Sequence, residues 1–402
     1  MGGHDFIGYE SPRISRRRLL NAAAGLSLVS VLGGCRPVTA ARALPQQGAD
    51  APGAGRAPEI FVDYEYGDLK EAVVGIPFGI YPDLDAVPWL QEAIKVLPES
   101  EAAKLRARSG QDTISLGKYG VMEQENLALI DVLKQYGVKV HRPAMFSREQ
   151  VAGNFGEEYV LAAGAEQQYA RDPILVIGSN VIENTMGSLP RRADILGLCG
   201  LLLERVLGSN AAWVSMPVAD YALMLGDGNY DKTLFPVLEG GDVIVLGKKI
   251  LVGNSANRAF GSSELGYRWL KAYLGPQGYD VERVPLTEDI LHLDVALSVP
   301  RPGLIIVCPE VMSAGVPACF DGWQRIEVSR EDTRYLAANG LPINPDVYIM
   351  GYNDHFDGAH VQSELERAGI QVHRIYFAAH NEDGGSIRCS THPFVRRSAA
   401  GG

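Results

Sequence analysis

The chain has 402 residues, of which 46% are hydrophobic and 21% are charged. This composition is typical of a folded globular protein and excludes a disordered or fibrous one. The formal net charge of −11 argues against a nucleic-acid partner, whose phosphates need a basic face, and favours small cationic ligands through long-range attraction.

The first 35 residues predict an export signal. Arg16 and Arg17 precede an apolar run from Ala22 to Leu32 that is too short to span a bilayer as a mature helix. The arginine pair resembles a twin-arginine signal, which delivers proteins to the twin-arginine export machinery. Leu32-Gly33-Gly34-Cys35 resembles a lipobox with Cys35 as the acylated residue, and Val38-Thr39-Ala40 offers ordinary cleavage as the alternative. We therefore expect a periplasmic or extracytoplasmic protein, with lipidation of Cys35 as one of two outcomes.

Residues 36–60 are rich in Ala, Pro, Gly and Gln and predict a flexible linker, followed by a catalytic domain over residues 61–397. Within this domain Cys199, Cys308 and Cys319 stand between apolar residues, a setting typical of buried free thiols. A disulfide between Cys308 and Cys319 stays open as an alternative. No pair of cysteines has the spacing of zinc ligands.

One unit recurs along the domain: a hairpin of two short apolar strands, then a helix, then a closing strand. The expected hairpins cover residues 174–182, 243–252 and 295–307, the helices 121–136, 263–274 and 359–368, and the closing strands 137–142, 278–283 and 369–374. Such units predict an α/β ring or propeller of ββαβ modules. Because equivalent ends of the modules meet at the axis of a ring, polar residues near the hairpins would converge on one site.

Cys389 is the candidate nucleophile of that site. Gly384 and Gly385 precede it and polar residues surround it, where a core strand would continue apolar, which argues against the alternative of a structural thiol. A thiol attacks only as the thiolate, so a positive group must lower its pKa. Arg388, His292 or a bound cationic substrate could do this.

Carboxylates and a histidine accompany the thiol. His292 and Asp294 alternate with leucines and are expected on one face of a strand, while Glu239 and Asp242 flank two glycines. Paired carboxylates suit a guanidinium, which is a planar cation with five donors. A hydrogen bond from His292 to Glu239 would raise the pKa of the histidine and make it a general acid. The alternatives are a structural His292, a tight turn at Glu239 to Asp242 and a turn that begins at Asp172.

Arg191 and Arg258 are candidate grips for a substrate carboxylate, with surface solvation as the alternative. Asp242 and Arg388 complete the predicted substrate-binding set. The remaining histidines form no spaced metal cluster, and no phosphate-binding glycine loop opens a helix. We therefore expect neither a metal nor a cofactor.

In order and approximate spacing these motifs resemble the guanidine-modifying superfamily with the pentein fold, which contains arginine deiminases, dimethylarginine hydrolases and amidinotransferases. The resemblance covers residues 61–397 and rests on Arg171-Asp172, Glu239-Gly240-Gly241-Asp242, His292-Leu293-Asp294 and the segment from Gly384 to Thr391. It implies an α/β fold, a five-bladed propeller of ββαβ modules with pseudo-fivefold symmetry.

The resemblance also implies roles for the site residues. Cys389 would attack the guanidinium carbon while Asp172 and Asp294 hold its nitrogens. His292, oriented by Glu239, would protonate the departing amine and leave an amidino-cysteine. No long helical insertion separates Asp172 from Glu239, which resembles the glycine and inosamine-phosphate amidinotransferases more than the larger arginine deiminases.

The expected function is thus the transfer of the amidino group of L-arginine, or of a related guanidine, to an acceptor amine. One alternative is a hydrolase of the same fold that uses water and gives citrulline. A more distant one is a non-catalytic envelope lipoprotein that only binds guanidines. The sequence does not set the oligomeric state.

Overall fold

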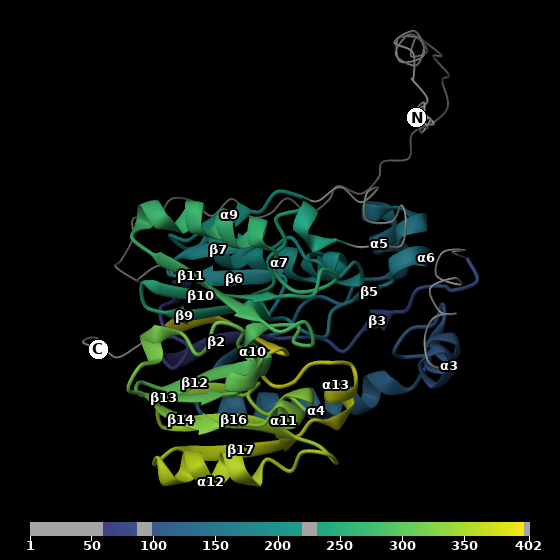
Figure 1. The fold of residues 1–402 in the computed structure, drawn as a ribbon. Helices are drawn as coiled ribbons and strands as arrows, with labels where there is room; N and C mark the ends of the chain where they lie inside the picture. The colour runs from purple at the N-terminus through teal and green to yellow at the C-terminus, as the bar shows by residue number, and fades with distance from the viewer. Residues whose placement is uncertain (1–58, 87–98, 219–230, 398–402) are drawn as a thin grey trace, which may run out of the picture. The chain divides into compact units, whose positions relative to one another are not determined.

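The computed structural model describes residues 59–86, 99–218 and 231–397 (Figure 1). All of them belong to a compact unit that spans residues 56–402. The predicted export signal, the predicted lipidation site at Cys35 and the linker up to residue 58 lie outside the described residues.

Five three-stranded sheets make up the body of this unit, and in each the first two strands are antiparallel and the last two parallel. Four are continuous in sequence: β6 (Ile174–Ile177), β7 (Asn180–Glu183) and β8 (Ala212–Ser215); β9 (Val243–Leu246), β10 (Lys249–Ser255) and β11 (Asp280–Leu286); β12 (Leu297–Arg301), β13 (Leu304–Val307) and β14 (Gln324–Glu327); β15 (Leu341–Asn344), β16 (Val347–Tyr352) and β17 (Gln371–Tyr376).

The fifth sheet joins the two ends of the folded unit. Its strands are β18 (Thr391–Arg397), β2 (Asp68–Val74) and β4 (Lys139–His141), and β1 (Phe61–Val62) pairs with the outer edge of β18. Thr391 pairs with Val74 and Arg397 with Asp68. The last strand therefore supplies the first position of the module that β2 begins. A separate two-stranded sheet contains β3 (Gly79–Ile80) and β5 (Ala165–Glu166).

A helix connects the second and third strands in four of the five modules. These helices are α4 (Lys118–Gln135), α7 (Asp194–Leu207), α9 (Glu264–Leu274) and α12 (Ala359–Arg367), and α9 and α12 lie on opposite sides of the unit in Figure 1. The remaining module has the short turns η5 (Pro309–Val311) and η6 (Ala318–Phe320) instead. The other helices are α3 (Glu99–Arg108), α5 (Arg148–Phe155), α6 (Glu157–Ala163), α10 (Leu293–Ala296), α11 (Arg330–Arg334), α13 (Ala378–Glu382), η1 (Pro190–Ala193), η2 (Lys232–Leu234), η3 (Gly240–Asp242) and η4 (Gly275–Gln277).

The expected hairpins, helices and closing strands are present to within a few residues, because each was read from a local apolar pattern. The hairpin turns contain Gly178 (φ 56°) and Gly247 (φ 65°), in the left-handed region that two-residue hairpin turns require. The middle strand β13 is apolar on both faces, and all four of its residues are buried. Burial of each such side chain contributes about 1.5–3 kcal/mol.

The expected strand through His292 and Asp294 is wrong. His292 has an extended backbone, but Leu293–Ala296 form the short helix α10, and β12 begins only at Leu297. The physical reason is a distant carboxylate: Asp242 Oδ1 accepts a hydrogen bond from Leu293 N at 2.9 Å and stabilises the start of the helical turn. His292 and Asp294 therefore do not share a strand face.

Two of the three cysteines expected to be buried are exposed, namely Cys199 on α7 and Cys319 in η6, whereas Cys308 is buried. Cys199 and Cys319 have apolar neighbours in the sequence, but both lie on the outer side of their elements. All three are free thiols in the structure, so Cys308 and Cys319 form no disulfide there. Within the described ranges, no helix combines the length and apolarity needed to cross a bilayer.

Candidate active site

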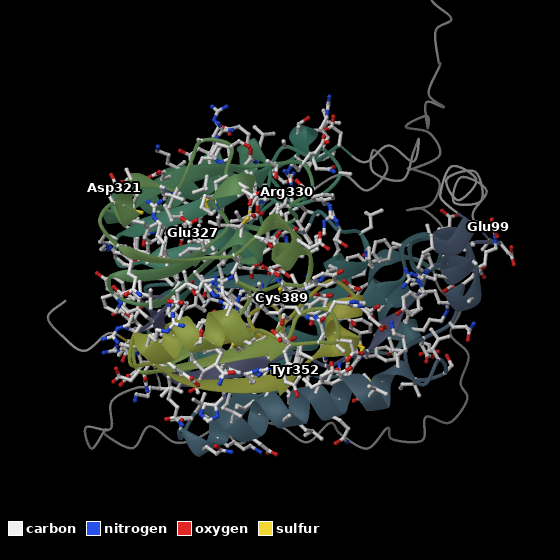
Figure 2. The ribbon with its side chains drawn as sticks, turned by 60° about the horizontal axis from the view of Figure 1, so that its bottom comes forward. Glu99, Asp321, Glu327, Arg330, Tyr352 and Cys389 are labelled. Carbon is white, nitrogen blue, oxygen red and sulfur yellow. The ribbon has the colours of Figure 1, made fainter. Side chains whose placement is uncertain are left out.

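Cys389 lies in the buried segment that leads into β18, near the middle of the unit (Figure 2). Its side chain is 5% exposed. Cys389 N donates to Asn339 Oδ1 at 3.2 Å, and its carbonyl accepts from Arg171 N at 3.0 Å. Gly385 permits this path, because a Cβ there would stand 2.2 Å from the Tyr169 ring. The thiol is thus held by backbone contacts to two other modules.

Asp294 is the carboxylate beside the thiol. Cys389 Sγ lies 3.9 Å from Asp294 Oδ2, which also pairs with Arg388 Nη1 at 2.8 Å. Asp294 Oδ1 is buried and has no hydrogen-bond partner among the described residues. A buried acceptor without a donor costs free energy unless a ligand satisfies it. Burial raises the pKa of Asp294, although Arg388 opposes the shift.

The surroundings of Cys389 also shift the pKa of its thiol. Burial raises the pKa of Cys389, and the charges of Asp294 and Asp172 raise it further. Without a ligand the sulfur is therefore a neutral thiol at pH 7. A cation that enters beside Asp294 would favour the thiolate, because it offsets the carboxylate charge next to the sulfur.

His292 lies between two carboxylates. Its Nε2 is 2.6 Å from Glu239 Oε2, and its Nδ1 is 3.8 Å from Asp172 Oδ1. Burial alone would lower the pKa of His292, but Asp172, Glu239 and Asp242 outweigh it and raise the pKa to about 10. The ring is therefore an imidazolium at neutral pH, which is the form that can donate a proton.

Glu239 and Asp172 are each fixed by backbone groups. Glu239 Oε1 accepts from Gly187 N at 2.8 Å and from Ser188 N at 3.2 Å. Asp172 Oδ1 accepts from Gly241 N at 2.7 Å, and its Oδ2 pairs with Arg191. Both oxygens of Asp172 are thus engaged. In these contacts Asp172 supports the charge of His292, and the acceptor without a partner among the described residues is on Asp294. That Asp172 also holds a guanidinium stays a prediction.

Asp242 is also engaged on both oxygens. It is fully buried, and it accepts from Leu293 N at 2.9 Å and from Ser262 N at 2.7 Å. Burial raises its pKa to about 6. In the structure Asp242 positions the turn that carries His292, and its predicted role in substrate binding stays a prediction.

The arginines expected to contact substrate are occupied as well. Arg191 pairs with Asp172, Asp194 and Glu166. Arg388 is 2% exposed and pairs with Glu65 as well as Asp294. In the structure the donors of both guanidinium groups therefore contact protein carboxylates.

Arg258 lies elsewhere. Its side chain is 72% exposed and pairs with Asp231, apart from the buried cluster. The predicted contacts of these three arginines with a substrate stay predictions. The sequence alone could not identify carboxylate partners that come from other modules.

Sequence reasoning also missed two residues that hold the nucleophile segment. Asn339 binds Cys389 N, and its Nδ2 donates to the Asp294 carbonyl at 3.3 Å, so one amide aligns both. Glu65 receives two hydrogen bonds from Arg388. The sequence signal for Asn339 is weak: it is a polar residue that directly follows the short apolar stretch ending at Ala338.

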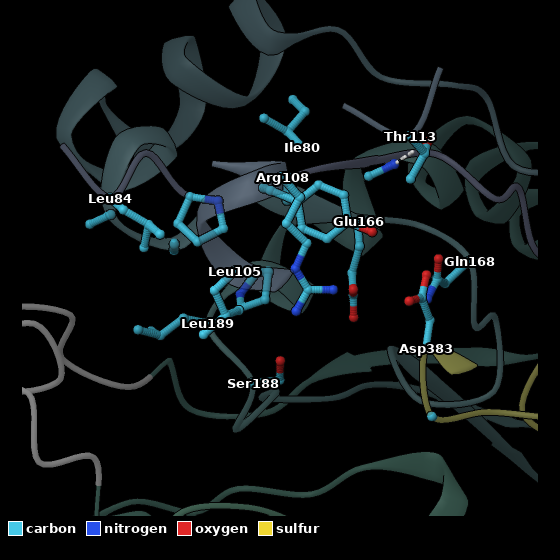
Figure 3. A pocket seen from close by; sticks show the side chains of 18 of the residues that line it. Ile80, Leu84, Leu105, Arg108, Thr113, Glu166, Gln168, Ser188, Leu189 and Asp383 are labelled. Carbon is cyan, nitrogen blue, oxygen red and sulfur yellow. Dashed lines mark hydrogen bonds between the residues drawn. The ribbon is translucent and has the colours of Figure 1, made fainter. Parts of the chain in front are cut away.

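A cavity of about 670 Å³ adjoins this cluster. Figure 3 shows Arg108, Glu166, Gln168 and Asp383 along its wall. Gly187 and Ser188, whose N–H groups bind Glu239, also line it. A second cavity, of about 730 Å³, shares Arg108, Glu382 and Asp383 with the first. In the parts of the chain that the structure describes, no group of three or more His, Cys, Asp or Glu side chains could hold a metal ion.

Comparisons with known proteins show which folds and sequences this chain is similar to. No protein-family model matches the chain. A solved amidinotransferase of saxitoxin biosynthesis from Microseira wollei superposes with a TM-score of 0.65 at 20% identity, over 85% of this chain and 99% of that one. The chain has the pentein fold. Its five modules are therefore the blades of a pentein propeller with pseudo-fivefold symmetry.

Curated relatives point to the amidinotransferases of this superfamily. The inosamine-phosphate amidinotransferase 1 of Streptomyces glaucescens is 25% identical over 83% of this chain and 95% of its own length. A putative inosamine-phosphate amidinotransferase 2 of Streptomyces griseus is 32% identical over 51% of this chain, and the match spans 58% of that relative. An arginine deiminase of Listeria innocua is 27% identical over 57% of this chain and 61% of its own length. The pentein described here is homologous to the amidinotransferases and, more broadly, to guanidine hydrolases.

Proposed function

We propose that the protein is an amidinotransferase that moves the amidino group of L-arginine, or of a related guanidine, to an acceptor amine. The observation that carries the proposal is the arrangement of a thiol 3.9 Å from a carboxylate with one unpartnered oxygen, near an imidazolium between two further carboxylates. A planar cation with several donors fits the thiol and the unpartnered carboxylate oxygen, and an amine that must be protonated to leave fits the imidazolium.

In the first half-reaction the guanidinium donates hydrogen bonds to Asp294 Oδ1, and its charge promotes ionisation of Cys389. The Sγ atom then attacks the guanidinium carbon, a C–S bond forms, and the C–N bond to the amine breaks. His292 donates its proton to the departing nitrogen, while Glu239 and Asp172 hold the ring in place. The thiol proton passes to solvent, and His292 takes up a proton from solvent after it has protonated the amine, so protons and charge balance over the half-reaction.

In the second half-reaction an acceptor amine attacks the amidino carbon and breaks the C–S bond. The product is a new guanidine, and the thiol is restored. If water attacks the amidino-cysteine instead, the products are urea and the free thiol, and the protein is a hydrolase. Citrulline forms where ammonia, and not the alkylamine, leaves in the first half-reaction and water then attacks. The sequence similarity to an arginine deiminase supports hydrolysis as the second candidate function. A protein that only binds guanidines would need neither the buried thiol nor the paired histidine.

The test uses the purified full chain with L-arginine, with and without glycine or another amine. Ornithine that forms only with an acceptor supports transfer, and citrulline supports hydrolysis. Intact-mass analysis should detect an added amidino group that disappears in Cys389→Ala. Absence of both products and of the adduct would contradict the proposal for arginine.

We also propose, from residues 1–35, export by the twin-arginine route. Fusion of these residues to a reporter that needs this route for export would test it, with Arg16→Lys/Arg17→Lys as the control. Metabolic labelling with a fatty acid, compared with Cys35→Ala, would test lipidation. An unprocessed cytoplasmic reporter would contradict the export proposal.

A further inference from the structure

Arg108, the last residue of α3, is a cation on the wall of the 670 Å³ cavity. Its guanidinium stacks over the Tyr81 ring at 4.8 Å from the ring centroid. Figure 3 shows it between Leu105 and Glu166, facing the cavity. No carboxylate among the described residues lies within ion-pair distance of it, and its Nε is buried without a partner. Arg191 and Arg258, by contrast, are both paired.

Asp383 supplies the opposite charge on the same wall. Its side chain is nine-tenths buried, and its Oδ1 lies 2.6 Å from Lys118 Nζ. Its Oδ2 is buried and has no partner within the described part of the chain. The cavity thus presents an open guanidinium fork and an open carboxylate oxygen. This is the complement of a zwitterion.

The cavity adjoins the catalytic cluster, because Gly187 and Ser188 line it and their N–H groups bind Glu239. Its volume is in the range that small-molecule sites occupy. A ligand that binds against Arg108 and Asp383 would therefore lie beside the segment that holds Glu239.

We propose that Arg108 binds the α-carboxylate and Asp383 the α-ammonium group of the amidino donor, so that the donor is a free α-amino acid. This inference rests on the proposed function. An arginine fork pairs with a carboxylate through two parallel hydrogen bonds, which gives both strength and orientation. A donor that lacks either head group leaves one of these two residues unsatisfied.

Binding to the Cys389→Ala protein tests the inference independently of turnover. The ligands are L-arginine, agmatine, which lacks the carboxylate, and 5-guanidinopentanoate, which lacks the amine. We expect the Kd of arginine to be about ten- to hundredfold lower than that of either analogue.

Variants in the same background assign the two contacts. Arg108→Gln should raise the Kd of arginine and of 5-guanidinopentanoate by about tenfold or more. It should leave the Kd of agmatine within about twofold of its value for the parent protein. Asp383→Asn should raise the Kd of arginine and of agmatine and leave the Kd of 5-guanidinopentanoate unchanged. Arg108→Lys keeps the positive charge but loses the two parallel donors of the guanidinium. Its Kd for arginine should lie between those of the parent protein and of Arg108→Gln. The matched control is Arg106→Gln on the same helix, an exposed residue paired with Glu99.

The outcomes separate the two proposals. Equal affinity of the three ligands, or equal weakening of all three by Arg108→Gln, would overturn the inference, even where the wild-type protein forms its Cys389 adduct. No adduct on wild-type Cys389 with any of the three guanidines would overturn the proposed function. The binding pattern then still decides whether Arg108 and Asp383 recognise a zwitterion. Circular dichroism of each variant verifies that it is folded.

Discussion

His292 Nε2 lies 2.6 Å from Glu239 Oε2, and both side chains are 2–3% exposed. A buried imidazolium survives only with a carboxylate to compensate it. The contact expected between these residues is present. It makes the histidine a proton donor whose strength depends on one neighbour, and this dependence can be measured.

Glu239→Gln should lower the pKa of His292 from about 10, because it removes a carboxylate from the ring while its amide oxygen can still accept from Gly187 and Ser188. Only the protonated ring donates to the leaving amine. The basic limb of the pH profile of kcat should therefore move to lower pH, and kcat should fall about a hundredfold at pH 9.

A pH series of kcat for both proteins measures this shift. Glu264→Gln, which changes a surface carboxylate on α9 paired with Arg283, is the matched control. An unchanged basic limb in Glu239→Gln would show that His292 is not the titrating acid.

Asp294→Asn should raise the reactivity of Cys389 and lower turnover at the same time. The carboxylate raises the pKa of the thiol, so its removal should speed alkylation by iodoacetamide roughly tenfold or more. The same change removes the acceptor proposed for the guanidinium, and kcat should fall about a hundredfold. Peptide mass spectrometry measures alkylation, with buried Cys308 as the internal reference. Slower alkylation would contradict the electrostatic assignment.

Arg388→Met should destabilise the fold by about 3–5 kcal/mol, because it leaves Glu65 and Asp294 buried without their cation. The double variant Glu65→Gln/Arg388→Met should recover part of that loss. Urea unfolding at pH 7 measures both. A single variant as stable as wild type would show that the ion pairs contribute little.

The same ion pair predicts a dependence of stability on pH. Burial alone would raise the pKa of Glu65, but Arg388 and Arg171 outweigh it and lower the pKa to about 2. The unfolded chain therefore binds this proton first as pH falls, so the contribution of Glu65 is complete above about pH 4.5 and is lost between 4.5 and about 2. Glu65→Gln should flatten the unfolding free energy over that interval, and an unchanged slope would contradict the assignment.

Gly241→Ala should disable the site without a change of charge. A Cβ at this position would lie 2.5 Å from His292 Nδ1, so the ring must move. A misplaced catalytic group of this kind costs about a hundredfold in kcat. Gly200→Ala is the control, because nothing lies within 4 Å of a Cβ built at this position. Gly200 is an exposed residue of α7, so the substitution should increase the free energy of unfolding by about 0.5–1 kcal/mol. Full activity of Gly241→Ala would mean that the ring has more room than the structure shows.

The strands, helices and hairpins could be predicted because each depends on a local apolar pattern. Partners separated by long stretches of sequence could not. The turn at His292 is set by Asp242, fifty residues earlier. The charge on Arg388 is satisfied by Glu65, more than three hundred residues away. Residue types in the motifs thus indicated the chemistry, and tertiary contacts decided which of them face a ligand.

Pairing of β18 with β2 has a consequence for biosynthesis. The nucleophile lies two residues before β18, and residues 391–397 must reach residues 68–74 before the ring closes. During translation the carboxylates and the histidine emerge long before the thiol. The chain therefore acquires its reactive sulfur only after the residues of the other modules have emerged, and a product truncated before residue 389 would carry no thiol at this position.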